Sequence, residues 1–254
     1  MTGRLDGSVA LVTGASSGIG EATARALAAE GAVVAVAARR KDRLEELTAR
    51  IEQDGGRALA LTTDVTEQAQ AVDAVERTVS EYGRLDILVN NAGVMYLGPV
   101  VDAPTDEWDR MVQINVMGLL YTAHAALPHL ARAAEDSGRR VADLVNISSV
   151  AARKANPVGA VYSLTKYGVN GFSEGLRQEV RGKHVRVSVV EPGQVETELN
   201  DHIRPEIRER MNRRPPQYDR LGSDDVADAV TYVVTRPRHV AVGELLVRPT
   251  EQER

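Results

Sequence analysis

The 254-residue sequence contains no cysteine, and this absence excludes several kinds of chemistry at once. Without cysteine there is no disulfide framework, no thiolate nucleophile and no metal site built on sulfur. Uninterrupted apolar runs of bilayer-spanning length are also missing, and residues 1–7 contain no apolar stretch of the kind found in signal peptides. We therefore expect a soluble, cytoplasmic protein.

The sequence also has no excess of basic over acidic side chains. The chain has 31 basic and 36 acidic side chains, which gives a formal net charge of −5. A nucleic-acid surface is not expected as the main partner, because such surfaces depend on clustered Lys and Arg. The length suits one α/β domain, or two small ones at most. No repeat or break in composition marks a second domain, so we expect one domain spanning residues 1–254.

Short β-branched runs alternate with longer helical patterns along the whole chain. Strands are expected at residues 9–13, 33–37, 58–62, 87–90, 141–148, 185–191 and 244–248. Helices are expected at residues 18–30, 44–51, 66–79, 105–135, 158–181 and 223–235, with Thr66 and Ser223 as N-caps. This alternation predicts an α/β fold with a doubly wound, mostly parallel sheet of seven strands and helices on both faces. Residues 193–222 are charged and rich in proline, and a segment of that length indicates a lid over the substrate.

A glycine-rich turn, Thr13-Gly14-Ala15-Ser16-Ser17-Gly18-Ile19-Gly20, follows the first predicted strand. Such glycines let the backbone turn sharply and approach a pyrophosphate, which the free N–H groups of the next helix attract. The spacing is wider than that of the commonest dinucleotide fingerprint. A tight turn without a ligand is the alternative, but the position directly after the first strand favours a dinucleotide site.

The second predicted strand ends in three cations, in the sequence Ala38-Arg39-Arg40-Lys41. An acidic side chain here would bind the ribose 2′-hydroxyl of NAD, whereas arginines can bind a 2′-phosphate through charge-assisted hydrogen bonds. The alternative is a basic helix start without a ligand, which the helix dipole disfavours. The sequence therefore predicts NADP(H) rather than NAD(H).

Polar and small residues follow the next two strands. Asp64-Val65 comes after the third strand, and Asn90-Asn91-Ala92-Gly93 ends the fourth. Ligands of open α/β sheets bind outside the carboxyl ends of the strands, so both stretches lie at the expected edge. Asp64 by itself could equally cap a loop.

Tyr162 and Lys166 are four residues apart on a predicted helix, which places the phenol and the ammonium on one face. A nearby cation favours the phenolate and is expected to lower the pKa of Tyr162. A tyrosine tuned in this way can give a proton to a carbonyl oxygen or take one from an alcohol. The same spacing is common on solvated helices, so it gains weight only from the other motifs.

Taken together, these motifs resemble the classical branch of the short-chain dehydrogenase/reductase family, which has a Rossmann-type fold. The resemblance covers nearly the whole chain, in order and at the family's spacing, and is carried by residues 13–20, 90–93, Ser149, Tyr162, Lys166 and Pro192-Gly193. More narrowly, Ala38-Arg39-Arg40 and the ending Val247-Arg248-Pro249-Thr250-Glu251-Gln252 resemble an NADP-dependent subgroup. That subgroup includes clavulanic acid dehydrogenase and bacterial 3-hydroxy acid dehydrogenases.

The resemblance implies a role for each of four catalytic residues. Tyr162 would transfer the proton, and Ser149, favoured over its neighbour Ser148 by the family's spacing, would hydrogen-bond the substrate oxygen. Lys166 would assist Tyr162 and hold the nicotinamide ribose. Asn115 would kink its helix and hold a proton-relay water, although a structural cap is an open alternative.

The resemblance also implies which residues meet the cofactor and the substrate. The expected cofactor residues are Gly14, Ser16, Ser17, Gly18, Ile19, Gly20, Arg39, Arg40, Asp64, Val65, Asn91, Gly93, Tyr162, Lys166, Pro192, Gly193, Val195 and Thr197. The expected substrate residues are Ser149, Tyr162, Met95, Val150, Ala151 and Gln194. This mostly apolar lining suits a small or medium aldehyde or ketone.

The expected function is thus an NADP(H)-dependent carbonyl reductase or alcohol dehydrogenase acting on a small molecule. Two alternatives stay open: a non-catalytic NADPH sensor, and a redox-neutral epimerase or dehydratase on the same scaffold. No membrane partner and no metal site are expected, because the five histidines are scattered along the sequence. Family resemblance further implies a homotetramer, or a homodimer.

Overall fold

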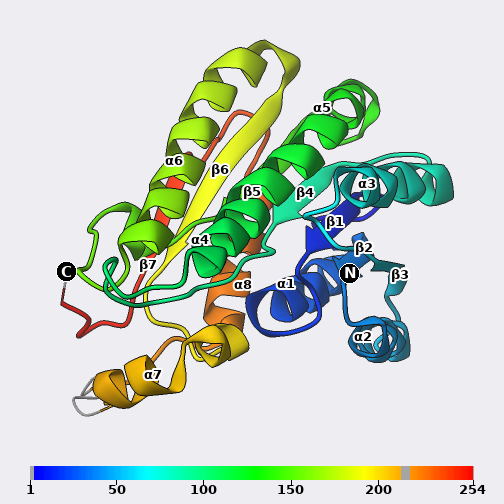
Figure 1. The fold of residues 1–254 in the computed structure, drawn as a ribbon. Coiled ribbons are helices and arrows are strands. Elements are labelled where there is room, and N and C mark those ends of the chain that lie inside the picture. The colour runs from blue at the N-terminus through cyan, green and yellow to red at the C-terminus, as the bar shows by residue number, and fades with distance from the viewer. Residues whose placement is uncertain (1–2, 213–217, 254) are drawn as a thin grey trace.

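A seven-stranded sheet organises the computed structural model, which describes residues 3–212 and 218–253. The strand order is β3-β2-β1-β4-β5-β6-β7, and every pair of neighbours is parallel (Figure 1). The strands are β1 (Val9–Thr13), β2 (Val33–Ala38), β3 (Arg57–Thr62), β4 (Ile87–Asn90), β5 (Ala142–Ile147), β6 (Val185–Pro192) and β7 (Glu244–Val247). The predicted doubly wound α/β class is confirmed.

Helices connect the strands and cover both faces of the sheet. The α-helices are α1 (Gly18–Ala29), α2 (Lys41–Gln53), α3 (Gln68–Tyr82), α4 (Thr105–Val112), α5 (Leu119–Asp136), α6 (Ala160–Val180), α7 (Pro205–Asn212) and α8 (Ser223–Val234). The shorter helical segments are η1 (Gln113–Gly118), η2 (Val150–Ala152), η3 (Arg181–Lys183) and η4 (Glu198–His202). In the described part of the chain, no helix combines the length and the apolar character that a membrane crossing requires.

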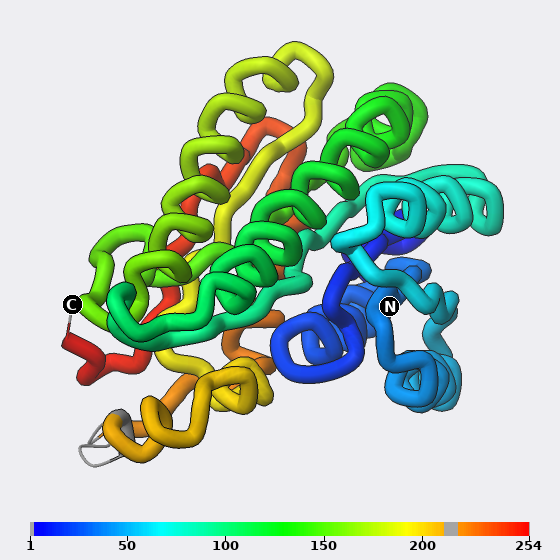
Figure 2. The backbone as a smooth tube through the Cα atoms, in the orientation of Figure 1, coloured from blue at the N-terminus to red at the C-terminus, as the bar shows by residue number. Residues whose placement is uncertain are grey.

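Alternation along each strand divides the core into two layers, as the period of a β-strand requires. On β1, Ala10 and Val12 pack with the side chains of α1, α2 and α8. Leu11, which lies between them, packs on the opposite face with the side chains of α3, α5 and α6. Figure 2 shows the two helix layers on either side of the sheet. All five residues of β1 are buried, which explains why the strand reads as a continuous apolar run rather than an alternating one.

Two predicted N-caps and the continuity of one predicted helix differ from the structure. Helix α3 begins at Gln68 with Glu67 as its N-cap, because Thr66 donates its hydroxyl to Asp64 instead of capping the helix. Helix α8 begins at Ser223, and its N-cap is Gly222. The predicted helix 105–135 exists, but its middle is a π-helical turn, η1.

Because all neighbouring strands are parallel, their carboxyl ends lie along one side of the sheet, the carboxyl edge, and their amino ends lie along the other, the amino edge. The strand order reverses between β1 and β4, and the connections after these two strands lead to helices on opposite faces of the sheet, which leaves a crevice of the kind that binds ligands in such folds. Figure 1 shows α7 lying at this end of the sheet, outside the two helix layers. Residues 213–217 of the predicted lid 193–222 lie outside the described residues, and its described parts include η4 and α7 and lie beside the crevice.

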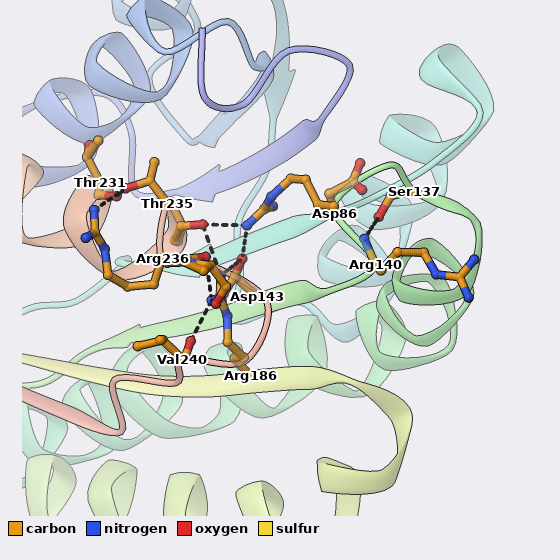
Figure 3. A network of polar contacts seen from close by, with 12 residues as sticks. Asp86, Ser137, Arg140, Asp143, Arg186, Thr231, Thr235, Arg236 and Val240 are labelled. Carbon is orange, nitrogen blue, oxygen red and sulfur yellow. Dashed lines mark hydrogen bonds and ion pairs between the residues drawn. The ribbon is translucent and has the colours of Figure 1, made fainter.

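The amino edge instead carries a buried network of ion pairs. Asp143, near the start of β5, is completely buried and accepts two hydrogen bonds from Arg186 of β6, at 2.7 and 3.0 Å. The remaining donors of Arg186 reach backbone carbonyls, including those of Arg236 and Val240, at 3.0 and 2.8 Å. Figure 3 shows this network, which joins two strands to the segment after α8. Asp86, just before β4, makes a similar buried pair with Arg84.

Candidate active site

A cavity of about 1250 Å³ opens at the carboxyl ends of the strands. It extends from the turn after β1, past the ends of β2 and β4, to the start of α6 and the segment after β6. All six predicted substrate residues line it, as do all of the predicted cofactor residues except Gly20. Of the four predicted catalytic residues, Ser149, Tyr162 and Lys166 line the cavity and Asn115 lies behind its wall.

The turn between β1 and α1 is shaped for close approach by a ligand. Gly14 and Gly18 adopt positive φ angles of 65° and 58°, a region that side-chain-bearing residues rarely enter. A Cβ atom on Gly14 would lie 2.7 Å from the Cα atom of Ala92, so the turn packs directly against the segment after β4. Asn91 fixes this contact by donating its amide to the carbonyls of Thr13 and Gly14, at 3.0 and 3.1 Å.

The amino end of α1 completes an anion site in this turn. Ser17 is the N-cap, and its side chain makes no capping hydrogen bond, so the first N–H groups of the helix remain available to a ligand. Gly20 lies one turn inside the helix and packs against Asn91, which explains why it does not face the cavity. These features fit the pyrophosphate of a dinucleotide.

The two arginines after β2 lie at the same end of the cavity but differ in their surroundings. Arg39 is exposed and makes no hydrogen bond or ion pair with any residue in the ranges 3–212 and 218–253. Arg40 instead donates to the hydroxyls of Ser16 and Ser17 and to the carboxylate of Glu198. No carboxylate occupies the end of β2 itself, so the site keeps the positive character that the sequence predicts.

Asp64 lines the cavity and also caps a loop. Its Oδ1 atom accepts hydrogen bonds from the backbone N–H and the hydroxyl of Thr66, at 3.0 and 2.8 Å. The residue therefore caps the loop after β3, and its role toward the cofactor stays a prediction. Its neighbour Val65 packs against Gly118 of η1 and ties the loop to the helix behind it.

Ser149 and Tyr162 meet at the opposite end of the cavity. Ser149 follows β5 and caps η2, where its Oγ atom accepts the N–H of Ala151 at 3.1 Å. The same hydroxyl lies near the phenol of Tyr162 and acts on its pKa. Tyr162 is only 7% exposed, because Val65, Ile114 and Ala151 pack around it. A buried phenol and a neighbouring hydroxyl can hold a substrate oxygen between them.

Lys166 lies one helical turn beyond Tyr162 and is 6% exposed. Its Nζ atom donates to the backbone carbonyl of Ile147 at 2.9 Å and lies 5.8 Å from the centroid of the Tyr162 ring. The i, i+4 spacing thus brings phenol and ammonium to one face, as predicted. The carbonyl at the end of β5 holds the ammonium in place.

The pKa values of this pair correct one part of the sequence prediction. Burial raises the pKa of Tyr162 to about 12, and the hydrogen bond from Ser149 opposes this only in part. Burial lowers the pKa of Lys166 to about 8. The expected lowering of the tyrosine pKa is therefore wrong for this structure, because burial of the phenol raises the pKa by more than Ser149 lowers it. Tyr162 keeps its proton at neutral pH and can act as a proton donor.

Asn115 lies in η1, the π-helical turn that interrupts the long helix where the sequence predicts a kink. Its amide is buried and engaged: Oδ1 accepts the N–H of Val94 at 2.8 Å, and Nδ2 donates to the Val94 carbonyl at 2.9 Å. Nδ2 also donates to the hydroxyl of Thr165 on α6, at 3.2 Å. Asn115 thus joins the segment after β4 to the helix that carries Tyr162. The water-relay role stays a prediction.

The substrate end of the cavity is more polar than the sequence indicated. Met95, Val150 and Ala151 line it as predicted, but Tyr96 does not and instead packs on His202 with ring centroids 5.9 Å apart. His202 belongs to the lid, and burial together with nearby arginines lowers its pKa. Additional polar side chains reach the cavity from Asn156, Asn200, Arg208, Arg220 and Gln252.

Gln252 shows how the chain end contributes to the site. Its Oε1 atom accepts the backbone N–H of Gln194 at 2.9 Å, just after β6. The backbone N–H of Gly193 donates to the carbonyl of Val247 at 2.7 Å, so residues 247–252, the tail, are held against the segment that follows β6. Sequence reasoning used the tail only as a mark of a subgroup. The available signal was Gln252 itself, a polar residue within the terminal segment that resembles the subgroup.

A second group that sequence reasoning missed supports the loop of Ser149. Arg153, just after η2, makes a bidentate pair with the buried carboxylate of Glu191, with distances of 2.7 to 3.0 Å. Asn170 of α6 donates to the same carboxylate at 2.7 Å, and Glu244 of β7 also pairs with Arg153. An acidic residue inside the otherwise apolar run of β6 was a visible signal, but its partners are distant in the sequence.

Metal-ligating side chains do not cluster in the described part of the chain, where no group of three His, Cys, Asp or Glu could hold an ion. Two of the histidines pair with other side chains. His129 contacts Glu76 at 3.0 Å and His184 contacts Arg238 at 3.3 Å, both away from the cavity.

Comparison with known families gives an independent view of this site. Residues 8–208 match the family model described as short chain dehydrogenase. An uncharacterized oxidoreductase of Staphylococcus aureus (strain MRSA252) is 37% identical over 241 residues, which cover 95% of this chain and 96% of that protein.

Solved structures with the same fold are also similar along the whole chain. The closed form of a serine dehydrogenase complexed with NADP+ aligns with a TM-score of 0.87 and 32% identity, covering 97% of this chain and 96% of that one. An alcohol dehydrogenase from the archaeon Thermococcus sibiricus, complexed with 5-hydroxy-NADP, aligns with a TM-score of 0.85 and 28% identity. Those coverages are 97% and 98%.

Proposed function

Since the chain belongs to the short-chain dehydrogenase family and is an oxidoreductase of that family, we propose that it is an NADP(H)-dependent carbonyl reductase or alcohol dehydrogenase. One observation carries the proposal: Ser149, Tyr162 and Lys166 line the wall of the same cavity that also contains the dinucleotide turn. We further propose that residues 1–254 form one NADP-binding and catalytic domain, with residues 193–222 as its substrate lid.

Three features support NADP(H) as the cofactor. The turn after β1 brings backbone N–H groups and the amino end of α1 to one place, which suits a pyrophosphate. Arg39 and Arg40 line the cavity after β2, where the adenosine ribose of the cofactor is expected, and cations suit its 2′-phosphate. Two structural relatives are solved with NADP or a derivative of it.

The side chains at the other end of the cavity supply the proton chemistry. When bound, the reduced nicotinamide supplies a hydride to the carbonyl carbon. Tyr162, which keeps its proton because burial raises its pKa to about 12, donates that proton to the carbonyl oxygen. Ser149 donates a hydrogen bond to the same oxygen as negative charge develops there. The Lys166 ammonium, 5.8 Å from the phenol ring, stabilises the phenolate that forms as the proton leaves.

The substrate we propose is a small or medium aldehyde or ketone, or the corresponding alcohol. The apolar side chains of Met95, Val150 and Ala151 favour a short carbon skeleton. Gln194, His202 and Asn156 add hydrogen-bonding groups at the same end, which suits a second polar group on the substrate. Both features are compatible with the proposed NADP-dependent subgroup that includes 3-hydroxy acid dehydrogenases.

A homotetramer in the cytoplasm completes the proposal. Leu164 and Tyr167 on α6 are 63% and 48% exposed, and Tyr232 on α8 is 49% exposed. Large apolar side chains on two helix faces suit burial against further subunits.

A screen that follows NADPH oxidation against aldehydes, ketones and β-keto acids tests the proposal. We expect one alcohol formed for each NADPH consumed, and a kcat/KM for NADPH above that for NADH. Product formation without net NADPH consumption would instead identify an epimerase or a dehydratase. NADPH binding without turnover of any carbonyl would identify a sensor. A preference for NADH would contradict the role given to Arg39 and Arg40.

A further inference from the structure

The guanidinium of Arg40 is occupied by neighbours on three sides. Its Nε and Nη2 atoms donate to the hydroxyl of Ser16 at 3.1 and 3.0 Å, and Nη2 also donates to the hydroxyl of Ser17 at 2.7 Å. Its Nη1 atom donates to the carboxylate of Glu198 at 2.8 Å. Arg40 is thus folded back over the dinucleotide turn and already holds an anion.

That anion belongs to the lid. Glu198 is the first residue of η4, and the preceding Thr197 caps this helix by accepting the N–H of Leu199 at 3.3 Å. Thr197 also lies against the dinucleotide turn, since its methyl group would be 3.2 Å from a Cβ atom on Gly18. The lid and the turn are therefore in contact, and Glu198 is placed beside the start of α1.

The groups around Glu198 are those that recognise a phosphate. Its carboxylate is paired with Arg40 and hydrogen-bonded to the hydroxyl of Ser17, and the charge of Arg43 acts on it as well. A guanidinium and a hydroxyl bind phosphate oxygens through the same donors that they use for a carboxylate. Arg39, one residue earlier, offers a matched contrast because it is exposed and has no such partner among residues 3–212 and 218–253.

From this arrangement we propose that Glu198 competes with the cofactor's 2′-phosphate for Arg40 and so limits the selectivity for the phosphorylated dinucleotide. The inference rests on the proposed use of NADP(H). A carboxylate and a phosphate repel each other at contact distance, so they cannot share the same donors without loss. The 2′-phosphate can bind Arg39 freely, but it gains Arg40 only by displacing Glu198. A dinucleotide without that phosphate leaves the Arg40–Glu198 pair intact and bears no such cost.

Binding of two mononucleotides isolates this effect from catalysis. Adenosine 2′,5′-bisphosphate carries the 2′-phosphate and 5′-AMP does not, and neither contains the nicotinamide. We expect Glu198→Gln to bind the bisphosphate about three- to tenfold more tightly than the unaltered protein, by isothermal titration at low salt. Affinity for 5′-AMP should stay within about twofold. The gain should shrink as salt is raised, because both side chains are partly exposed.

The chain offers a matched control for charge alone. Glu196 is an exposed carboxylate on the same segment, lines the same cavity and has no partner for its carboxylate among residues 3–212 and 218–253. Glu196→Gln removes the same charge without freeing Arg40, so it should leave the ratio of the two affinities nearly unchanged. An equal gain in both variants would overturn the inference in favour of a general charge effect.

Arg40→Ala separates this inference from the cofactor assignment. We expect it to weaken binding of the bisphosphate at least tenfold and to leave 5′-AMP unaffected. If Arg40→Ala behaves so and Glu198→Gln binds the bisphosphate equally or more weakly, Glu198 supports Arg40 and the competition is refuted. If Arg40→Ala changes neither affinity, Arg40 does not bind the 2′-phosphate, and that part of the proposed function fails first.

Discussion

The two edges of the sheet differ in how they bury ionisable side chains. At the amino edge, Asp143 is fully buried, and every oxygen of its carboxylate accepts a hydrogen bond from an arginine. The carboxyl edge also has a neutralised carboxylate, because the buried Glu191 pairs with Arg153. Beside it, however, Tyr162 and Lys166 are nearly as buried, and neither has an oppositely charged partner in contact among residues 3–212 and 218–253. Only the carboxyl edge therefore contains buried groups that become charged at a cost.

This difference separates stability from chemistry. A buried pair such as Asp143–Arg186 is satisfied on both sides, so its contribution is to hold strands and loops together. An unpaired buried group has a shifted pKa, as Tyr162 at about 12 and Lys166 at about 8 illustrate. Such groups are candidates for exchanging a proton with a substrate oxygen. The fold therefore concentrates reactivity at the edge where the strand order reverses and the backbone leaves room for ligands.

The largest expected effect is the loss of turnover in Tyr162→Phe. Removing the phenol removes the proposed proton donor, and we expect kcat to fall about 10³-fold with an accepted carbonyl substrate. NADPH affinity and the thermal unfolding midpoint should change little. Tyr167→Phe is the control, because Tyr167 lies on the same helix and is exposed. Turnover in Tyr162→Phe within tenfold of the unaltered enzyme would refute the catalytic role.

At the opposite edge, Asp143→Asn should reduce stability and leave the chemistry intact. The change leaves the guanidinium of Arg186 buried without its negative partner, and we expect a loss of about 3 kcal/mol in the free energy of unfolding. Urea denaturation measures it, with kcat determined on the folded enzyme. Asp73→Asn is the control, since its pair with Arg77 is exposed and 3.9 Å long. A large fall in kcat without loss of stability would contradict the division between the edges.

Ser149→Ala should have a smaller effect at the carboxyl edge. The variant loses the proposed donor to the substrate oxygen and a hydroxyl that acts on the pKa of Tyr162, and we expect kcat/KM to fall about 10²-fold. Its neighbour gives the comparison: Ser148 is buried and makes only a long contact, 3.4 Å, with the carbonyl of Lys166. Ser148→Ala should lose less than Ser149→Ala in the same assay. The reverse order would transfer the role to Ser148.

Much of the carboxyl edge could be predicted from the sequence because its signals are local. The dinucleotide turn, the cations after β2 and the Tyr162–Lys166 spacing each lie within eight residues, and the structure brings them to one cavity. Strand positions were predictable for the same reason, since buried parallel strands form continuous apolar runs. Whether these residues perform the predicted chemistry is left to the experiments.

The features that sequence reasoning missed all join residues that are distant in the chain. Glu191 holds Arg153 across 38 positions, and Arg40 holds Glu198 across 158. The local sequence around a carboxylate in a strand does not show which arginine will pair with it in the fold. The pKa directions were missed for a related reason, because desolvation depends on the packing around Tyr162 and not on its spacing from Lys166. Spacing predicts which groups meet, and burial decides how they titrate.

The smallest expected effect is a pH dependence that belongs to Lys166. Because burial lowers its pKa to about 8, the ammonium is lost within the range of ordinary assays, while Tyr162 stays protonated. The charged form stabilises the phenolate left after proton donation, so kcat/KM for reduction should fall about tenfold between pH 7 and pH 9. Arginine keeps its charge throughout this range, so Lys166→Arg should give a lower rate with a flat profile. Equal slopes in the two enzymes, measured with a substrate that does not titrate there, would assign the break to another group.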